Sequence, residues 1–124
     1  MIKFNKEMVL SLYKVMVDNT GGTFGIRDES MLESAINAPY QTFGGEELYK
    51  DTIEKAARLG YGLVANHPFI DGNKRIGIFI MLVFLEVNGI YFEFTDSEIE
   101  HIALNIAAGK YIYDDLLFIL RSKE

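Results

Sequence analysis

The sequence predicts an all-α fold, a single helical bundle with a small flap or hairpin, over residues 1–124. Apolar residues recur at helical spacing through most of the chain, which is the primary signal of amphipathic helices. Residues that cap helices stand at the starts of these segments, and Gly or Pro stands at their ends. The length suits one domain with one core, and no repeat, low-complexity tract or linker divides it.

The N-terminal part predicts two helices. The first covers residues 5–19, with Asn5 as its N-cap. Its expected core face is the apolar set at helical spacing, Met8, Leu12, Val15 and Met16. Asp28 caps a shorter helix over residues 29–37, which Pro39 ends.

The middle of the chain predicts a turn and two longer helices. Residues 40–51 have no clear period and contain two adjacent glycines, which favours a loop or a small hairpin. Residues 52–66 return to a helical pattern. Their expected buried side is Ile53, Ala56, Ala57, Leu59, Gly60, Leu63 and Val64. A further helix of about 15 residues ends at Asn88-Gly89, a pair typical of a helix C-terminus.

The C-terminal part predicts a short strand and two helices. The strand is "IYFEF" at residues 90–94, which is rich in aromatic side chains. Thr95, with Glu98 three positions on, forms a capping box for a helix that runs to about Ala108. Residues 112–121 then form the last helix.

Composition narrows the classes of partner and the expected location. The formal net charge is −6, which argues against nucleic acid or an anionic membrane as the main partner. The chain has no cysteine, which excludes disulfides, thiol catalysis and Cys-based zinc sites, and fits a reducing compartment. No signal-peptide pattern opens the sequence, and the apolar run 76–85 is shorter than the roughly 20 residues of a membrane span. We therefore expect a cytoplasmic protein.

One polar cluster interrupts this ordinary pattern, the stretch "HPFIDGNKR" at residues 67–75. It joins two predicted helices, because Pro68 stops the first and Asn73 is a good N-cap for the second. The free N–H groups at such a helix start favour an anion, and the two basic residues that follow add positive charge. The predicted phosphate-binding residues are Gly72, Asn73, Lys74 and Arg75.

Three other residues of the cluster complete a candidate catalytic set. Phosphate would repel Asp71 unless a cation lay between them, which makes Asp71 a candidate ligand of Mg²⁺. Histidine is well suited to general-base catalysis near neutral pH, which makes His67 the candidate base for a hydroxyl. Phe69 is the expected structural anchor of the loop. The set predicts transfer from a nucleotide phosphate to a hydroxyl.

Each of these residues also has an ordinary explanation when it is taken alone. A histidine before proline is usually a helix-end residue, and an Asp-Gly pair is usually a turn. The conjunction of these residues within nine positions is what favours a function. The other histidine, His101, lies at helical spacing and is interpreted as structural.

The stretch resembles the signature of the Fic/Doc (Fido) family, His-x-Phe-x-(Asp/Glu)-(Gly/Ala)-Asn-x-(Arg/Lys). The resemblance covers nearly the whole chain. The short length, "GGTFGIRD", the helix before the motif and "FLEVNGI" after it are similar to the Doc (death-on-curing) group, the toxins of toxin–antitoxin modules. This resemblance implies a Fic/Doc-type helical bundle.

The resemblance also implies a role for each matched residue. In the family, the histidine takes the proton from a target protein's hydroxyl, the acidic residue holds Mg²⁺, and the Asn and basic residues bind the phosphates of ATP. The matching residues here are His67, Asp71, Asn73, Lys74 and Arg75, with Phe69 as the buried anchor. The loop 40–50 corresponds to the flap that lines up the target segment.

Two positions bear on which group is transferred. Most Fic enzymes transfer AMP and have Gly where this chain has Lys74 and a second Arg where it has Ile78, and both differences resemble Doc. The resemblance therefore implies a protein serine/threonine kinase that uses ATP and Mg²⁺, phosphorylates elongation factor Tu and inhibits translation. Pro68 and Gly72 are closer to Fic, so AMP transfer to a protein hydroxyl stays as the alternative. A non-catalytic binding module that kept the fold is the second alternative.

The resemblance further implies a partner that controls the activity. Many Fic enzymes carry an inhibitory helix with the pattern Ser/Thr-x-x-x-Glu-(Gly/Asn), and this sequence has no match to it. We therefore expect a cognate antitoxin whose C-terminal segment folds as a helix against the N-terminal helix and the "GGTFG" loop. No direct nucleic-acid or membrane partner is expected.

Overall fold

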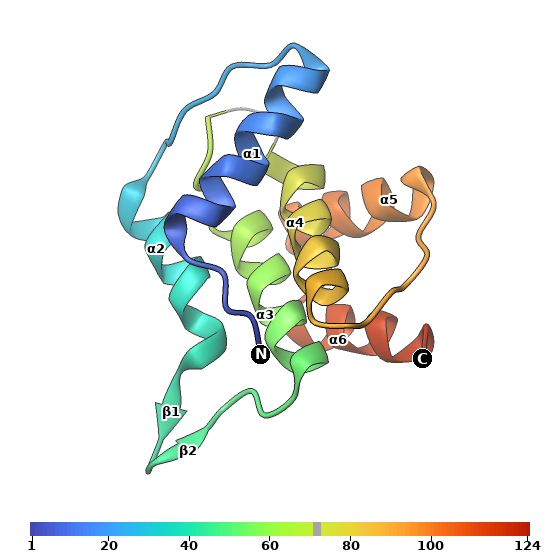
Figure 1. Cartoon of the computed structure of the whole chain (residues 1–124). Helices are drawn as coiled ribbons and strands as arrows, with labels where there is room; N and C mark the ends of the chain where they lie inside the picture. Colours follow the sequence, from blue (N-terminus) through green and yellow to red (C-terminus); the bar gives the residue numbers. More distant parts are fainter. Residues whose placement is uncertain (71–72) are drawn as a thin grey trace.

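The computed structural model describes residues 1–70 and 73–124, with the backbone alone for Asn73 (Figure 1). Within these residues the secondary structure is helical apart from one two-stranded hairpin, which confirms the predicted all-α class. The elements in chain order are α1 (Lys6–Thr20), α2 (Glu29–Asn37), the 3-10 helix η1 (Ala38–Tyr40), β1 (Thr42–Phe43), β2 (Glu46–Glu47), α3 (Thr52–Ala65), α4 (Asn73–Val87), α5 (Asp96–Ala107) and α6 (Tyr113–Ser122). None of the helices in these residues is long and apolar enough to span a membrane.

The helix boundaries follow the capping residues that the sequence indicates. The side chains of Asn5 and Asp28 each accept a hydrogen bond from the backbone N–H three residues on, at 2.9 and 3.0 Å. Both bonds of the predicted capping box form before α5. Glu98 N–H donates to Thr95 Oγ1 at 3.1 Å, and Thr95 N–H donates to Glu98 Oε1 at 2.9 Å. These caps satisfy backbone donors that a first helical turn leaves without a partner.

The buried face of α1 differs from the predicted one. Val9, Tyr13 and Val17 are at most 2% exposed, whereas Val15 is 58% exposed. The other residues of the predicted face are only partly buried and pack against the edge of the core, namely Met8, Leu12 and Met16. The observed buried face is therefore rotated around the helix relative to the predicted one. Tyr13 makes the main contact with the core, and the apolar periodicity alone does not identify this aromatic residue as buried.

The turn predicted within residues 40–51 is a hairpin. β1 and β2 pair antiparallel, with Thr42 opposite Glu47 and Phe43 opposite Glu46. Gly44 and Gly45 join the strands with φ angles of 60° and 82°. Two successive positive φ angles are what the favoured two-residue hairpin turn requires, and glycine adopts them without a steric penalty.

The prediction of a strand at residues 90–94 is wrong. The structure assigns this segment no strand or bridge, and it connects α4 to α5 without regular structure (Figure 1). Its Ile90, Phe92 and Phe94 side chains are partly buried against the core. The apolar residues of this segment therefore cover the bundle, and no strand among residues 1–70 and 73–124 pairs with the segment.

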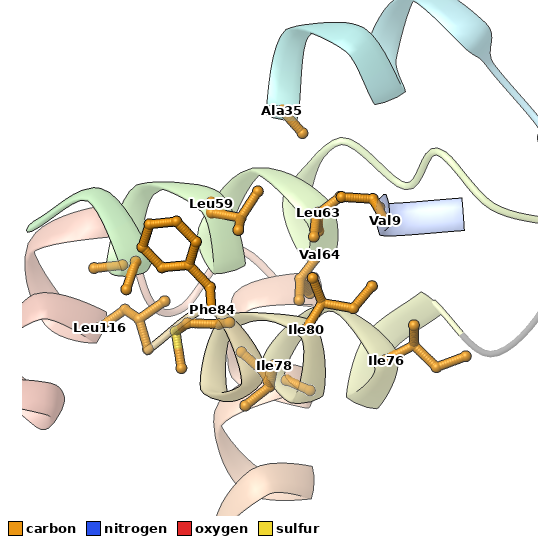
Figure 2. Packing of buried hydrophobic residues seen from close by; sticks show 14 of the residues in the cluster. Val9, Ala35, Leu59, Leu63, Val64, Ile76, Ile78, Ile80, Phe84 and Leu116 are labelled. Atoms are coloured by element: carbon orange, nitrogen blue, oxygen red, sulfur yellow. The ribbon is translucent and has the colours of Figure 1, made fainter. Parts of the chain in front are cut away.

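The centre of the bundle is the pair formed by α3 and α4. α3 packs against α4, α2, α5 and α6, and Figure 1 shows α2 on one side of the central pair and α5 and α6 on the other. The apolar run of α4 is buried as predicted, with Ile76, Ile78, Ile80, Met81, Phe84 and Leu85 at most 6% exposed. Figure 2 shows Leu59 and Val64 of α3 facing Phe84 and Ile80 of α4.

A glycine determines how closely α4 approaches the end of α3. A Cβ atom added to Gly77 would lie 2.8 Å from Val64 Cγ2 and 3.2 Å from the Val64 backbone nitrogen. A larger residue would push the helices apart at this point, because interiors are packed without spare volume. Gly77 therefore keeps the start of α4 beside the end of α3, where the polar motif begins.

Candidate functional site

The candidate catalytic base follows the C-terminus of α3. Asn66 is the C-cap of this helix, and His67 comes next with a φ angle of 49°. Within the described part of the chain, His67 is the only residue other than glycine with a positive φ. This left-handed conformation is uncommon for residues with a Cβ, although histidine is one of those enriched in it. The side chain of His67 is exposed.

The connection between α1 and α2 pairs with the backbone of this loop. The N–H of Arg27 donates to the carbonyl oxygen of Pro68 at 2.7 Å, and the N–H of Ile70 donates to the carbonyl oxygen of Gly25 at 2.9 Å. A single antiparallel bridge joins the residues between them. Residues 25–28 therefore fix the motif loop by backbone hydrogen bonds. No local sequence pattern indicates this pairing.

The side chain of Arg27 also reaches this loop. Its Nε donates to the carbonyl oxygen of His67 at 2.6 Å, and its Nη2 donates to the carbonyl oxygen of Asn66 at 3.2 Å. Backbone carbonyls at a helix C-terminus have no partner within the helix, and a cation is favoured there. The sequence assigns Arg27 no role, because the contact joins segments about forty residues apart.

The side chains of the loop are divided between the interior and the solvent. Pro68 and Phe69 are buried, whereas His67 and Ile70 on either side are exposed. The ring of Phe69 is fully buried and stacks on Tyr13 of α1. The loop therefore directs an aromatic side chain into the core while His67 lies on the surface, an arrangement that suits the predicted anchor role of Phe69.

Three of the predicted site residues line one cleft of about 990 Å³, His67, Lys74 and Arg75. Much of the remaining lining is apolar and comes from α1, α4 and α5, namely Met16, Ile76, Phe79 and Leu104. The volume is within the range of ligand sites, which combine apolar walls with a few polar groups. Asp71, Gly72 and the side chain of Asn73 lie outside the described residues, so their predicted roles stay predictions.

The two basic residues of the motif are available to a ligand. Lys74 and Arg75 lie in the first turn of α4, and both side chains are exposed. Neither makes an ion pair with any residue among 1–70 and 73–124. Positive charge at a helix N-terminus is unfavourable for the helix dipole, so an anion in the cleft would relieve both charges.

Polar residues that the motif does not include also line the cleft. Asn19 and Thr20 come from the end of α1, and Asp96 and Glu100 come from α5. The two acidic residues are four positions apart on one helix, which places them on the same face. The sequence indicates that Asp96 and Glu100 share a helix face. It does not indicate that they line the same cleft as the motif, because that depends on how α5 packs.

The described residues contain no preformed metal-binding cluster. Among residues 1–70 and 73–124, no three His, Asp or Glu side chains come together as a metal-binding group. Mg²⁺ commonly needs only one or two carboxylates, since substrate phosphates and water supply its other ligands. A magnesium site that includes Asp71 stays a prediction, because that residue lies outside the described part.

The hairpin, which the resemblance implies is a flap, does not border the cleft. None of residues 40–50 lines the cleft. α3 begins beside the hairpin and ends beside His67, and its 14 residues span roughly 21 Å. Figure 1 shows the hairpin projecting at the opposite end of α3 from the loop. The segment that borders the cleft and pairs with the motif loop is instead the connection that contains Gly22 and Gly25.

Comparisons with known proteins agree with this architecture. The family model described as "Fic/DOC family" matches residues 3–85, a range that includes the whole motif. A protein named "Toxin Doc" from Mycolicibacterium smegmatis is 37% identical over 70 residues, which cover 56% of this chain and 54% of that protein. This alignment therefore spans about half the length of that relative.

A second relative matches over most of the chain. The "Protein kinase doc" of Escherichia phage P1 is 26% identical over 115 residues, which cover 93% of this chain and 90% of that protein. This alignment extends the similarity well beyond the motif, to most of the chain.

Proposed function

Because the chain belongs to the Fic/DOC family, we propose that it is a Doc-like toxin that transfers a phosphate from ATP to a serine or threonine hydroxyl of a target protein. The observation that carries the proposal is the meeting of His67, Lys74 and Arg75 in one cleft. The names of the two relatives, a toxin and a protein kinase, point to the same class of activity.

The proposed chemistry depends on positioning and charge. His67 accepts the proton of the target hydroxyl, whose oxygen then attacks the γ-phosphorus of ATP. The bond from that phosphorus to the oxygen shared with the β-phosphate breaks, and ADP leaves. Lys74 and Arg75 hold the phosphates and offset the negative charge that builds up on them. The exposed position of His67 in the cleft suits a substrate as large as a protein.

Magnesium is part of the proposal through Asp71. When bound, Mg²⁺ would neutralise charge on the ATP phosphates. Asp71→Asn should therefore weaken nucleotide binding in the presence of Mg²⁺, as measured by calorimetry. Without Mg²⁺ it should strengthen binding, because the neutral amide no longer repels the phosphates. Equal effects with and without the metal would assign Asp71 a role other than holding Mg²⁺.

Two residues favour phosphate transfer over AMP transfer. Lys74 lines the cleft, whereas most Fic enzymes have Gly at this position, so its side chain would take up space beside the phosphates of a bound nucleotide. Ile78 is fully buried and does not line the cleft, so no arginine is available at the position of the second Fic arginine. Both features support a nucleotide pose that presents the γ-phosphate to the hydroxyl.

The proposed partners are a translation factor and an antitoxin. Elongation factor Tu is the proposed target, and phosphorylation of it would inhibit translation. The antitoxin segment is proposed to lie along the cleft, because Met16 and Gly22 of the expected docking region already line it. Its apolar walls suit one face of an amphipathic helix.

The deciding experiment measures the mass added to the target. The chain is incubated with ATP, Mg²⁺ and purified elongation factor Tu, and the intact target is weighed by mass spectrometry. Addition of one phosphate, absent with the His67→Ala variant, is the expected result. Addition of one AMP would replace the kinase by an AMP transferase, and no adduct in the presence of tight nucleotide binding would favour the binding module.

A further inference from the structure

We propose that Arg27 is a positioning residue for the transfer step, because it fixes the backbone that carries His67. Arg27 donates to three successive carbonyl oxygens of the loop. Its Nη2 reaches Asn66 at 3.2 Å, its Nε reaches His67 at 2.6 Å, and its backbone N–H reaches Pro68 at 2.7 Å. The peptide units on both sides of the His67 Cα are thereby tied to one residue.

The backbone conformation of His67 explains why such a restraint is needed. A φ of 49° is unfavourable for a residue with a side chain, and it persists only where the surroundings over-determine it. If the Nε bond were lost, the His67 carbonyl could turn and the residue could relax toward negative φ. That change would move the imidazole relative to Lys74 and Arg75, which belong to another helix.

The end of α3 is held independently of the Arg27 side chain. The N–H of Asn66 donates to Gly62 at 2.9 Å within the helix, and its side-chain Nδ2 donates to the carbonyl oxygen of Met31 on α2 at 3.1 Å. Arg27 itself is exposed. Loss of its guanidinium should therefore leave the bundle folded while it releases His67, whose positive φ is unfavourable.

The kinetic part of this inference rests on the proposed function, whereas the restraint itself is testable without any transfer. The chain has two histidines, so ¹⁵N-histidine NMR resolves His67 and uses His101 as an internal reference. In Arg27→Ala, the imidazole signals of His67 should shift or broaden while those of His101 stay in place. Coincident His67 signals in Arg27→Ala and the wild type would overturn the proposal.

Arg121→Ala is the matched control. Arg121 also joins distant segments, since its Nη2 donates to Asp51 at 2.6 Å, but it does not line the cleft. This variant should leave both histidine signals unchanged even where its stability falls. Movement of the His67 signal in Arg121→Ala as large as in Arg27→Ala would show that general destabilisation, and not loss of the Arg27 contacts, is responsible.

Kinetics with ATP and elongation factor Tu separate positioning from folding. In Arg27→Ala, kcat should fall about 10- to 100-fold with KM near the wild-type value, since small displacements of a reacting group have effects of this size. Arg27→Lys should recover little, because an ammonium cannot reproduce the fork of the guanidinium. Free guanidinium ion at millimolar concentration should restore part of the rate in Arg27→Ala and none in His67→Ala. If the rate of Arg27→Ala falls only as much as its folded fraction, the kinetic role is overturned. If the wild-type chain shows no transfer, the proposed function is overturned, and the NMR result alone decides whether Arg27 restrains His67.

Discussion

The ring of Tyr13 stacks on the ring of Phe69, with centroids 4.0 Å apart and planes inclined by 18°. The Tyr13 hydroxyl is 3.2 Å from the carbonyl oxygens of Thr23 and Gly25, and it accepts from the Gly25 N–H at 3.3 Å. One buried tyrosine therefore contacts two segments. Its ring packs on the motif loop, and its hydroxyl contacts the connection between α1 and α2 that pairs with this loop.

These two contacts of Tyr13 can be separated by substitution. Tyr13→Phe keeps the stacked rings but removes the hydroxyl, so we expect the free energy of unfolding to fall by about 1–3 kcal/mol, the cost of leaving partly buried polar groups without a partner. Phe69→Ala removes the stacked ring and should cost about 3–5 kcal/mol. Urea unfolding measures both. Equal losses in the two variants would contradict this division of roles.

Much of the fold could be predicted because its signals are local. Asn5, Asp28 and the Thr95–Glu98 pair each act within one helical turn, so sequence alone locates the helix starts. The burial of α4 was also predictable, since an apolar run of that length has no alternative to the core. The strand at 90–94 failed because a strand needs a partner, which the local sequence does not reveal.

The candidate site was only partly predictable, for a related reason. The motif brings His67, Lys74 and Arg75 within nine positions, so their proximity follows from a single loop and helix start. The contribution of Arg27 depends on a contact across about forty residues, and that of Glu100 depends on the packing of α5. Neither contact leaves a periodic or capping signal in the sequence.

The two histidines are expected to differ in their effect on transfer. His67→Ala should lower the rate of transfer to the target by a factor of about 10²–10⁴, the usual contribution of a general base, with little change in unfolding temperature. His101→Ala is the control, because His101 is exposed and its Nε2 is 3.0 Å from the hydroxyl of Tyr111, away from the cleft. Undiminished transfer by His67→Ala would exclude His67 as the base.

Acid should weaken the contact between α3 and α6. Partial burial raises the pKa of Asp51, but hydrogen bonds from Arg121 and from the Glu54 backbone N–H lower it by more, so the pKa lies below its ordinary value of 3.8. A carboxyl with a lowered pKa in the folded state stabilises the protein above that ordinary value, and loses this contribution as the pH falls through the lowered pKa.

Asp51→Asn tests this pH dependence. Asparagine keeps an acceptor for the helix cap but loses the ion pair with Arg121, so we expect a loss of about 0.2–1 kcal/mol at pH 7. The difference from the wild type should shrink as the pH falls below 3.8, as measured by urea unfolding at a series of pH values. A difference that stays constant down to pH 2.5 would contradict the assignment to Asp51.

The hairpin is anchored by a buried lysine. Lys55 of α3 is 3% exposed, and its Nζ lies 3.2 Å from Glu47 Oε1 and donates to the carbonyl oxygen of Tyr49. Lys55→Met keeps the apolar stem but leaves the carbonyl without this donor, so unfolding should be easier by about 1–3 kcal/mol. Hydrogen exchange at the Leu48 N–H, which donates to Gln41 across the hairpin, should accelerate.

Lys55→Met also tests whether the hairpin acts as a flap. Because no hairpin residue lines the cleft, transfer per folded molecule should be unchanged. The control is Lys50→Met, which removes an exposed lysine 3.9 Å from Glu46 and should leave both exchange and stability near the wild type. A raised KM for the target in Lys55→Met alone would restore the flap role to residues 40–50.

Lys74 provides the sharpest test of which phosphate reacts. Transfer goes to the phosphorus that lies in line with the hydroxyl near His67, so whatever orients the nucleotide selects the product. The exposed side chain of Lys74 adds bulk and charge to the cleft, whereas glycine would leave its space and the helix-start N–H groups free. Lys74→Gly should therefore lose kinase activity and gain some AMP transfer.

Two further variants separate the causes of this change. Lys74→Met keeps much of the bulk without the charge, so it should lose kinase activity without gaining AMP transfer. Lys110→Gly removes a lysine that shares with Lys74 only the smaller neighbouring cavity of about 450 Å³, and it should leave the adduct unchanged. Mass spectrometry of the target distinguishes one phosphate from one AMP. If Lys74→Gly gives the same phosphate adduct at the wild-type rate, Lys74 does not orient the nucleotide, and the burial of Ile78 becomes the remaining difference from the Fic enzymes that transfer AMP.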